Sequence, residues 1–120
     1  MVRITLKGNA LSTNNIYKHG GRVSYMSKNG KELKQSYIEQ VTAQYKEAKL
    51  EGDLEVEVRL YFGDKRQRDW DNYHKLSFDS LSGVVWHDDV QVMKAIVWKK
   101  YDKQNPRIEL IINKFNDTKK

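Results

Sequence analysis

The 120-residue chain has no cysteine, a single proline and no apolar run of membrane-spanning length. The absence of cysteine excludes a disulfide framework and any thiolate metal site, so a metal must be held by oxygen or imidazole. Neither a run of about 18 apolar residues nor a charged-then-apolar leader is present, which predicts a cytoplasmic protein without a membrane segment. Acidic residues are also fewer than basic ones.

The 22 Lys and Arg outnumber the 16 Asp and Glu, which gives a formal net charge of +6 and favours an anionic partner such as nucleic acid. Hydrophobic residues make up 38% of the chain and charged residues 32%, which is typical of a globular protein rather than a disordered one. We therefore expect one domain over residues 1–120, ending in a polar tail at about 116–120.

The hydrophobic pattern alternates between strand and helix periods along the chain. Strands are expected over residues 2–7, 54–62, 90–102 and 107–115, and helices over 31–51 and from about Trp70 to Leu81. The last two strands are expected to form an antiparallel hairpin, and residues 8–30 a long polar loop. The order β-α-β-α-β-β predicts an α+β fold, with a mixed or mostly antiparallel sheet of about four strands and two helices packed on it.

Two aspartates two residues apart, Asp69 and Asp71, follow a basic segment directly before the second helix. Taken alone, such acids are most often helix caps, and Asp71 with Lys75 is most often a surface ion pair. Two acids exceed the needs of one cap, however, and a second acidic pair, Asp88 and Asp89, precedes the next strand. Gathered carboxylates repel unless a cation neutralises them, and Mg²⁺ prefers oxygen ligands. We therefore expect a Mg²⁺ site built from Asp69, Asp71 and one of Asp88 or Asp89.

Basic side chains surround these acids and would meet a phosphodiester. Lys75 could orient the attacking water or offset charge that develops on the phosphate. Phosphate contacts that give affinity without sequence specificity are expected from Lys7, Lys18, His19, Arg22, Lys28, Lys31 and Lys34. The alternative for these residues is a solubilising surface, which is the reading we favour for the lysines of the first helix.

Residues 68–92, "RDWDNYHKLSFDSLSGVVWHDDVQV", resemble the RusA family of Holliday junction resolvases. The signature of that family is Asp-x-Asp-Asn-x-x-Lys at a helix start, Asp-x-Leu at the helix end and Asp-Asp before a strand. The positions that match are Asp69, Asp71, Asn72, Lys75, Asp79, Leu81, Gly83, Asp88, Asp89 and Gln91. The early "LSTNNIYKH" also resembles the family's Ser-Asn-Asn-x-x-Tyr loop, with Thr13 inserted after Ser12 and a shorter spacing to the tyrosine.

The resemblance implies a Mg²⁺-dependent endonuclease, with Mn²⁺ as a substitute, that acts as a homodimer and makes paired cuts in four-way DNA junctions during recombination or repair. It implies that Asp69, Asp71 and Asp89 bind the metal as the catalytic acids and that Lys75 is the catalytic lysine. Asp88 is either a further ligand or a neighbour of one. On the same basis, DNA contacts are expected from Lys65, Arg66, Arg68, Asn14, Asn15, Lys18 and Arg22.

Two other functions remain open at this point. A basic nucleic-acid-binding module without catalysis would use the acids as caps and ion pairs, and its salt-sensitive binding would be indifferent to Mg²⁺. A resolvase-like partner protein that only binds junctions is the third reading. The presence of the whole acidic set together with Lys75 favours the endonuclease.

Overall fold

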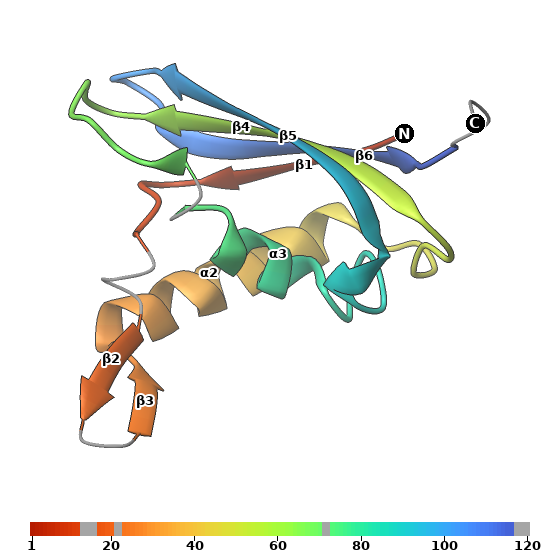
Figure 1. Ribbon diagram of the computed structural model, residues 1–120, viewed down its shortest axis with the longest axis horizontal. Helices are drawn as coiled ribbons and strands as arrows, with labels where there is room; N and C mark the ends of the chain where they lie inside the picture. Colours follow the sequence, from red (N-terminus) through yellow and green to blue (C-terminus); the bar gives the residue numbers. More distant parts are fainter. Residues whose placement is uncertain (13–16, 21–22, 71–72, 117–120) are drawn as a thin grey trace.

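The computed structural model describes residues 1–12, 17–20, 23–70 and 73–116, and its main feature is a four-stranded sheet. The strands lie in the order β1 (Val2–Lys7), β6 (Arg107–Lys114), β4 (Leu54–Phe62) and β5 (Val92–Tyr101). β6 is antiparallel to both β1 and β4, whereas β5 is parallel to β4, so the sheet is mixed. Both helices, α2 (Lys28–Gln44) and α3 (Lys75–Leu81), lie on one face of the sheet (Figure 1). The α+β prediction is confirmed.

The core lies between this sheet and the two helices. Strict alternation buries Leu54, Val56 and Val58 of β4 toward the helices and leaves the residues between them half-buried on the opposite, open face. Helix α2 begins where the Ser27 hydroxyl accepts a hydrogen bond from the Gly30 N–H at 3.0 Å, and it buries Tyr37 against the sheet.

The hairpin expected from the last two strands is wrong, because β4 lies between β5 and β6. The reason is burial. β6 carries apolar side chains on both faces, including Ile111, which is only 7% exposed on the open face, so it suits an interior position. β5 exposes lysines along most of its length, and such strands are found at sheet edges.

The expected long loop at residues 8–30 is also corrected. It contains a second, two-stranded antiparallel sheet made by β2 (Tyr17–Gly20) and β3 (Val23–Met26). Figure 1 shows this hairpin projecting beyond the start of α2, away from the main sheet. The first helix runs over 28–44 rather than 31–51, so Gly52 does not end it.

The second helix begins at Lys75 and not near Trp70. Trp70 is 48% exposed, whereas Ser77 and Leu81 of the helix are fully buried. His74 is the N-cap residue and its side chain makes no capping bond, so Asp69 does not cap this helix.

The two edges of the main sheet differ. At β1, Gln44 of α2 accepts a hydrogen bond from Thr5 N–H at 2.9 Å and donates one to Thr5 C=O at 2.7 Å. Gln40 does the same for Lys7, at 2.7 and 3.3 Å. Glutamines thus occupy the outer edge of β1, while β5 forms the opposite edge of the sheet. Within the described part of the chain, no helix is long and apolar enough to cross a membrane.

Candidate active site

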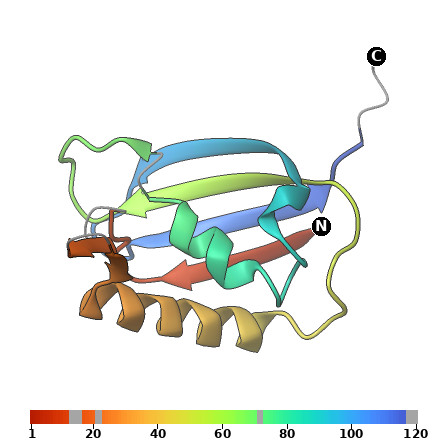
Figure 2. The ribbon, with the colours of Figure 1, turned by 60° about the horizontal axis from the view of Figure 1, so that its bottom comes forward.

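The acids of the candidate site are carried by the connection between β4 and β5. The chain leaves β4 through residues 63–69, forms α3, and enters β5 through the short 3-10 helix η2 (Asp89–Gln91). In Figure 2, α3 and η2 lie next to each other over the sheet. This arrangement places the first turns of α3 beside the acidic pair that precedes β5.

Asp88 and Asp89 are neighbouring carboxylates, and each shifts the pKa of the other. The Asp88 carboxylate accepts a hydrogen bond from the Val90 N–H at 3.0 Å, and this bond is the largest cause of the lowered pKa of Asp88. The pKa of Asp89 is raised, first by its hydrogen bond with Asp88 and then by burial and the charges of Asp88 and Asp79. Two such carboxylates hold a proton between them unless a cation replaces it. This all-oxygen donor pair fits a hard divalent cation such as Mg²⁺ or Mn²⁺.

Two side chains of α3 act on this pair. The charge of Lys75 lowers the pKa of Asp89 and that of Asp79 raises it, so both lie within electrostatic reach of the Asp89 carboxylate. The structure therefore brings together two members of the predicted catalytic set, Lys75 and Asp89. Asp79 had been given no role, although its spacing of four residues from Lys75 places both on the same face of a helix.

Asp69 lies in a different environment. It lines an open cleft of about 430 Å³ with Gln67, Arg68 and Lys99. The Lys99 Nζ donates a hydrogen bond to the carbonyl oxygen of Arg68 at 2.7 Å, so β5 holds the residue directly before Asp69. Within residues 1–12, 17–20, 23–70 and 73–116, no three Asp, Glu or His side chains are arranged to hold a metal.

Several predicted site residues lie outside the described part of the chain: Asp71, Asn14, Asn15 and Arg22. The side chain of Lys18 is likewise not described. The full metal-binding set of Asp69, Asp71 and Asp89 therefore stays a prediction, as do the roles of these DNA-binding residues.

The predicted DNA-binding side chains after β4 differ in how exposed they are. The Arg68 side chain is only 11% exposed: its guanidinium pairs with Asp64 at 2.9 Å and stacks on Phe62 at 4.4 Å from the ring centroid. Arg66 is 79% exposed, so it is the better placed to meet a ligand. Lys65 lies over the ring of Tyr101 at 5.0 Å.

The end of β5 adds cations that the sequence patterns did not single out. Exposed Lys99 and Lys100 share one cleft of about 270 Å³ with Lys65, Arg66 and Arg68. Nothing in the period-two pattern of β5 marks these lysines, because their proximity to the loop after β4 follows from the parallel pairing of the two strands.

A buried tryptophan anchors the segment between α3 and the acidic pair. Trp86 is fully buried, packs edge-on against Phe78 at 5.6 Å, and donates from Nε1 to the Ser82 hydroxyl at 2.9 Å. The chain turns toward it at Gly83, whose φ of +89° favours glycine. Asp88 and Asp89 thus follow closely after a residue, Trp86, that is anchored in the core.

Fold, acidic pair and basic cleft together define a class of protein that acts on nucleic acid, and the comparisons with known proteins agree. The Endodeoxyribonuclease RusA family matches residues 8–113, and this chain belongs to that family. The crossover junction endodeoxyribonucleases RusA of Shigella sonnei and of Escherichia coli strain K12 are each 32% identical over 111 residues, covering 88% of this chain and 89% of theirs. The relative from Enterobacteria phage 82 is 27% identical over 107 residues, with the same shares covered.

Proposed function

We propose that this protein is a Mg²⁺-dependent endonuclease that resolves four-way DNA junctions by paired phosphodiester cleavage during recombination or repair. The observation that carries the proposal is the neighbouring acidic pair of Asp88 and Asp89, within electrostatic reach of Lys75, in a chain of the RusA family. An acidic pair that no cation neutralises costs free energy, and it is useful if a divalent cation and a phosphate meet there.

The metal would be held by Asp69, Asp71 and Asp89, with Asp88 either a further ligand or a neighbour of one, and Mn²⁺ would substitute for Mg²⁺. When bound, the cation supplies the positive charge that polarises the scissile phosphate. Lys75 lies at the first turn of α3, beside Asp89, and its ammonium would offset the negative charge that grows on the phosphate oxygens.

DNA would approach along the cations at the far end of the sheet. Lys65, Arg66, Lys99 and Lys100 line one cleft there, and Asp69 lies in the neighbouring cleft beside Lys99. Lysine and arginine at such a surface contact phosphates irrespective of sequence, which suits an enzyme that recognises the shape of a branched substrate.

We also propose a homodimer that forms through β5, in a protein that acts in the cytoplasm. Of the eight large hydrophobic residues that are exposed in the described chain, five lie between residues 90 and 101: Val90, Met93, Ile96, Trp98 and Tyr101. β5 is also the edge of the sheet opposite the one that Gln40 and Gln44 cover. A twofold contact of β5 with β5 of a second copy would bury Ile96 and Trp98, which lie on one face of the strand, and give two equal active sites for two junction strands.

The experiment is cleavage of a synthetic four-way junction and of linear duplex, with and without Mg²⁺. The wild-type protein, Asp71→Asn, Asp89→Asn and the exposed control Glu47→Gln are compared. Paired cuts are expected in the junction only, with Mg²⁺ only, and not with either Asp variant. Junction binding by the Asp variants should be kept or tightened, because a carboxylate near phosphate is removed while the basic contacts remain.

A non-catalytic nucleic-acid-binding module is the alternative, and the same experiment separates the two. That alternative requires salt-sensitive junction binding that neither Mg²⁺ nor Asp71→Asn alters, with no strand cut. Cleavage that survives Asp89→Asn unchanged would remove Asp89 from the catalytic set.

A further inference from the structure

Gln91, the last residue of η2, uses every hydrogen-bonding group of its side chain on backbone atoms. Its Oε1 accepts from the N–H groups of His87 at 2.8 Å and Asp88 at 3.1 Å. Its Nε2 donates to the carbonyl oxygens of Leu50 at 3.0 Å and Gly52 at 2.9 Å. A primary amide offers two donors and one oxygen with two lone pairs, so this side chain is fully satisfied.

These four bonds join two segments that are far apart in the sequence. The accepted bonds hold the turn that carries Asp88 and Asp89, and the donated bonds reach the connection between α2 and β4, about 40 residues earlier. Gly52 has a φ of +77°, a backbone conformation that favours glycine. The Leu50 N–H also donates to the carbonyl oxygen of buried Val85 at 2.7 Å. The segment that Gln91 bonds is therefore itself hydrogen-bonded to the core.

The hydrogen bonds of Gln91 oppose a repulsion between the two carboxylates. Asp88 and Asp89 are adjacent and exposed, and two neighbouring carboxylates repel each other whenever both are ionised. A turn of three residues has little backbone bonding of its own to resist this force. Gln91 and Asp88 complete a reciprocal capping box, in which each side chain bonds the backbone of the other end of the turn.

We propose that Gln91 is the positioning residue that holds the Asp88–Asp89 carboxylate pair in the geometry that binds a divalent cation. This proposal rests on the proposed function above. Only an uncharged amide of this length can accept from two N–H groups on one side and donate to two carbonyls on the other. Glutamate would lack the donors, lysine would lack the acceptor, and asparagine is one methylene too short to reach both segments.

The test compares Gln91→Met with Gln44→Met in the full-length protein. Gln44 is a matched control, because its side chain also accepts from and donates to backbone atoms, at the far edge of the sheet on Thr5. Mn²⁺ binding to the DNA-free protein is measured by titration calorimetry, and junction cleavage is measured as kcat and KM over a range of Mg²⁺ concentrations. Circular dichroism melts show which variants are folded.

Loss of a residue that orients metal ligands typically lowers metal affinity or activity by about 10–100-fold, and we expect that loss for Gln91→Met in Mn²⁺ affinity and in kcat. The junction KM should stay unchanged, and raised Mg²⁺ should restore part of the rate, which a merely structural defect would not allow. Gln44→Met should lose stability without either effect. If Gln91→Met does not fold, Gln91→Asn, which keeps the amide, is expected to show the same losses.

Folded Gln91 variants with wild-type Mn²⁺ affinity and kcat would overturn this role, and so would a defect confined to the junction KM. Failure of the proposed function looks different, because the wild-type protein and Gln44→Met would then both be inactive and bind no Mn²⁺. That result would overturn the positioning role together with the endonuclease.

Discussion

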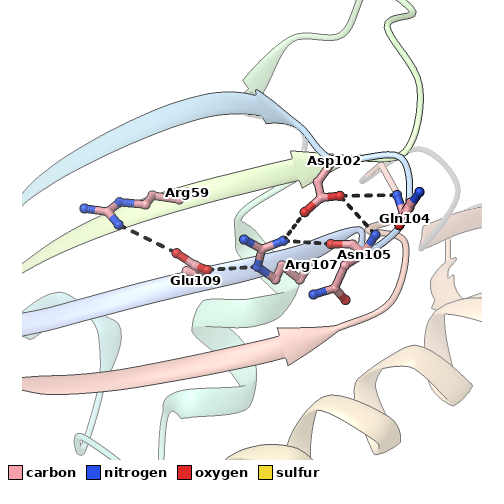
Figure 3. Close-up of polar contacts among 6 residues, drawn as sticks. All are labelled: Arg59, Asp102, Gln104, Asn105, Arg107 and Glu109. Atoms are coloured by element: carbon pink, nitrogen blue, oxygen red, sulfur yellow. Dashed lines mark hydrogen bonds and ion pairs between the residues drawn. The ribbon is translucent and has the colours of Figure 1, made fainter.

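At the scale of single residues, the Arg107 guanidinium pairs with two carboxylates, one in the turn before β6 and one on β6 itself (Figure 3). Its Nη1 pairs with Asp102 at 2.8 Å, its Nε pairs with Glu109 at 2.8 Å, and Arg59 approaches Glu109 from β4 at 3.7 Å. The Asp102 carboxylate also accepts the N–H groups of Gln104 and Asn105 at 3.2 Å. The negative charge of Asp102 therefore stabilises the turn that connects β5 and β6.

The pH dependence of stability follows from this arrangement. The hydrogen bond from Arg107 is the largest cause of the lowered pKa of Asp102, so its folded pKa lies below the unfolded value of about 3.9. A lowered pKa means that the stabilisation is present above the unfolded pKa and is lost as pH falls through the folded one. We expect Asp102→Asn to lower the melting temperature at pH 7, and the gap from wild type to shrink toward pH 2.

Thermal melts between pH 7 and pH 2 measure this gap. Asp53→Asn is the control, since Asp53 is exposed and forms no ion pair within the part of the chain that the structure describes. A gap that is independent of pH would show that the charge of Asp102 does not carry its contribution.

The roles predicted for individual site residues stay predictions. The sequence pointed to Asp88, Asp89 and Lys75 through their types and spacing, and the structure brings Lys75 within reach of Asp89. The sequence could not show that Arg68 is withdrawn onto Asp64 and Phe62. Side-chain contacts of that kind depend on where the loop after β4 folds back, and no periodic pattern encodes this.

At the scale of elements, the segment between α3 and β5 depends on one tryptophan. Trp86 is fully buried between α3 and the connection at Leu50, with which it forms a bridge. We expect Trp86→Ala to lower the free energy of unfolding by about 3–5 kcal/mol, as burial and packing of a large aromatic are lost. Trp86→Phe should cost about 1 kcal/mol, because it keeps most of the ring but loses the bond to Ser82.

Urea unfolding at pH 7 measures both changes. Trp70→Ala is the matched control, because Trp70 is 48% exposed and should cost much less. Equal losses for Trp70→Ala and Trp86→Ala would contradict the anchoring role of Trp86.

The loop after β4 and the end of β5 act together as one basic surface. We expect the double variant Lys65→Gln with Lys100→Gln to weaken junction binding and to lower the slope of log affinity against log salt by up to about 1.8, since each phosphate contact contributes about 0.9. The same measurement on Lys46→Gln with Lys49→Gln, two exposed lysines after α2, should leave the slope unchanged. A slope unaltered in the first variant would place DNA elsewhere.

The four strands of the main sheet and the two helices were predicted from the sequence, but the β2–β3 hairpin and the neighbours of β5 and β6 were not. The alternation in β5 and β6 gives two strands, and the short "KQNPR" link favours a hairpin. The structure separates them by β4 instead. Period-two patterns identify a strand and its buried face but carry no information on its neighbour, which depends on how many faces each strand must bury.

At the scale of the whole molecule, the exposed apolar side chains of β5 determine how copies would associate. We expect Trp98→Glu to convert a dimer to a monomer in light scattering coupled to size exclusion, because a charge would be buried at the proposed contact. Trp70→Glu is a fair comparison, since Trp70 and Trp98 are 48% and 49% exposed. A wild-type protein that is monomeric at micromolar concentration, or a Trp98→Glu dimer, would contradict the β5 contact.

The glutamines on β1 give this association a natural end point. A sheet with two open edges could add copies without limit and grow into a fibre. Here Gln40 and Gln44 already bond the outward groups of Thr5 and Lys7, so joining two copies at β5 leaves β1, with these groups bonded, at both margins of the combined sheet. The same helix that buries the core would thereby set the copy number at two.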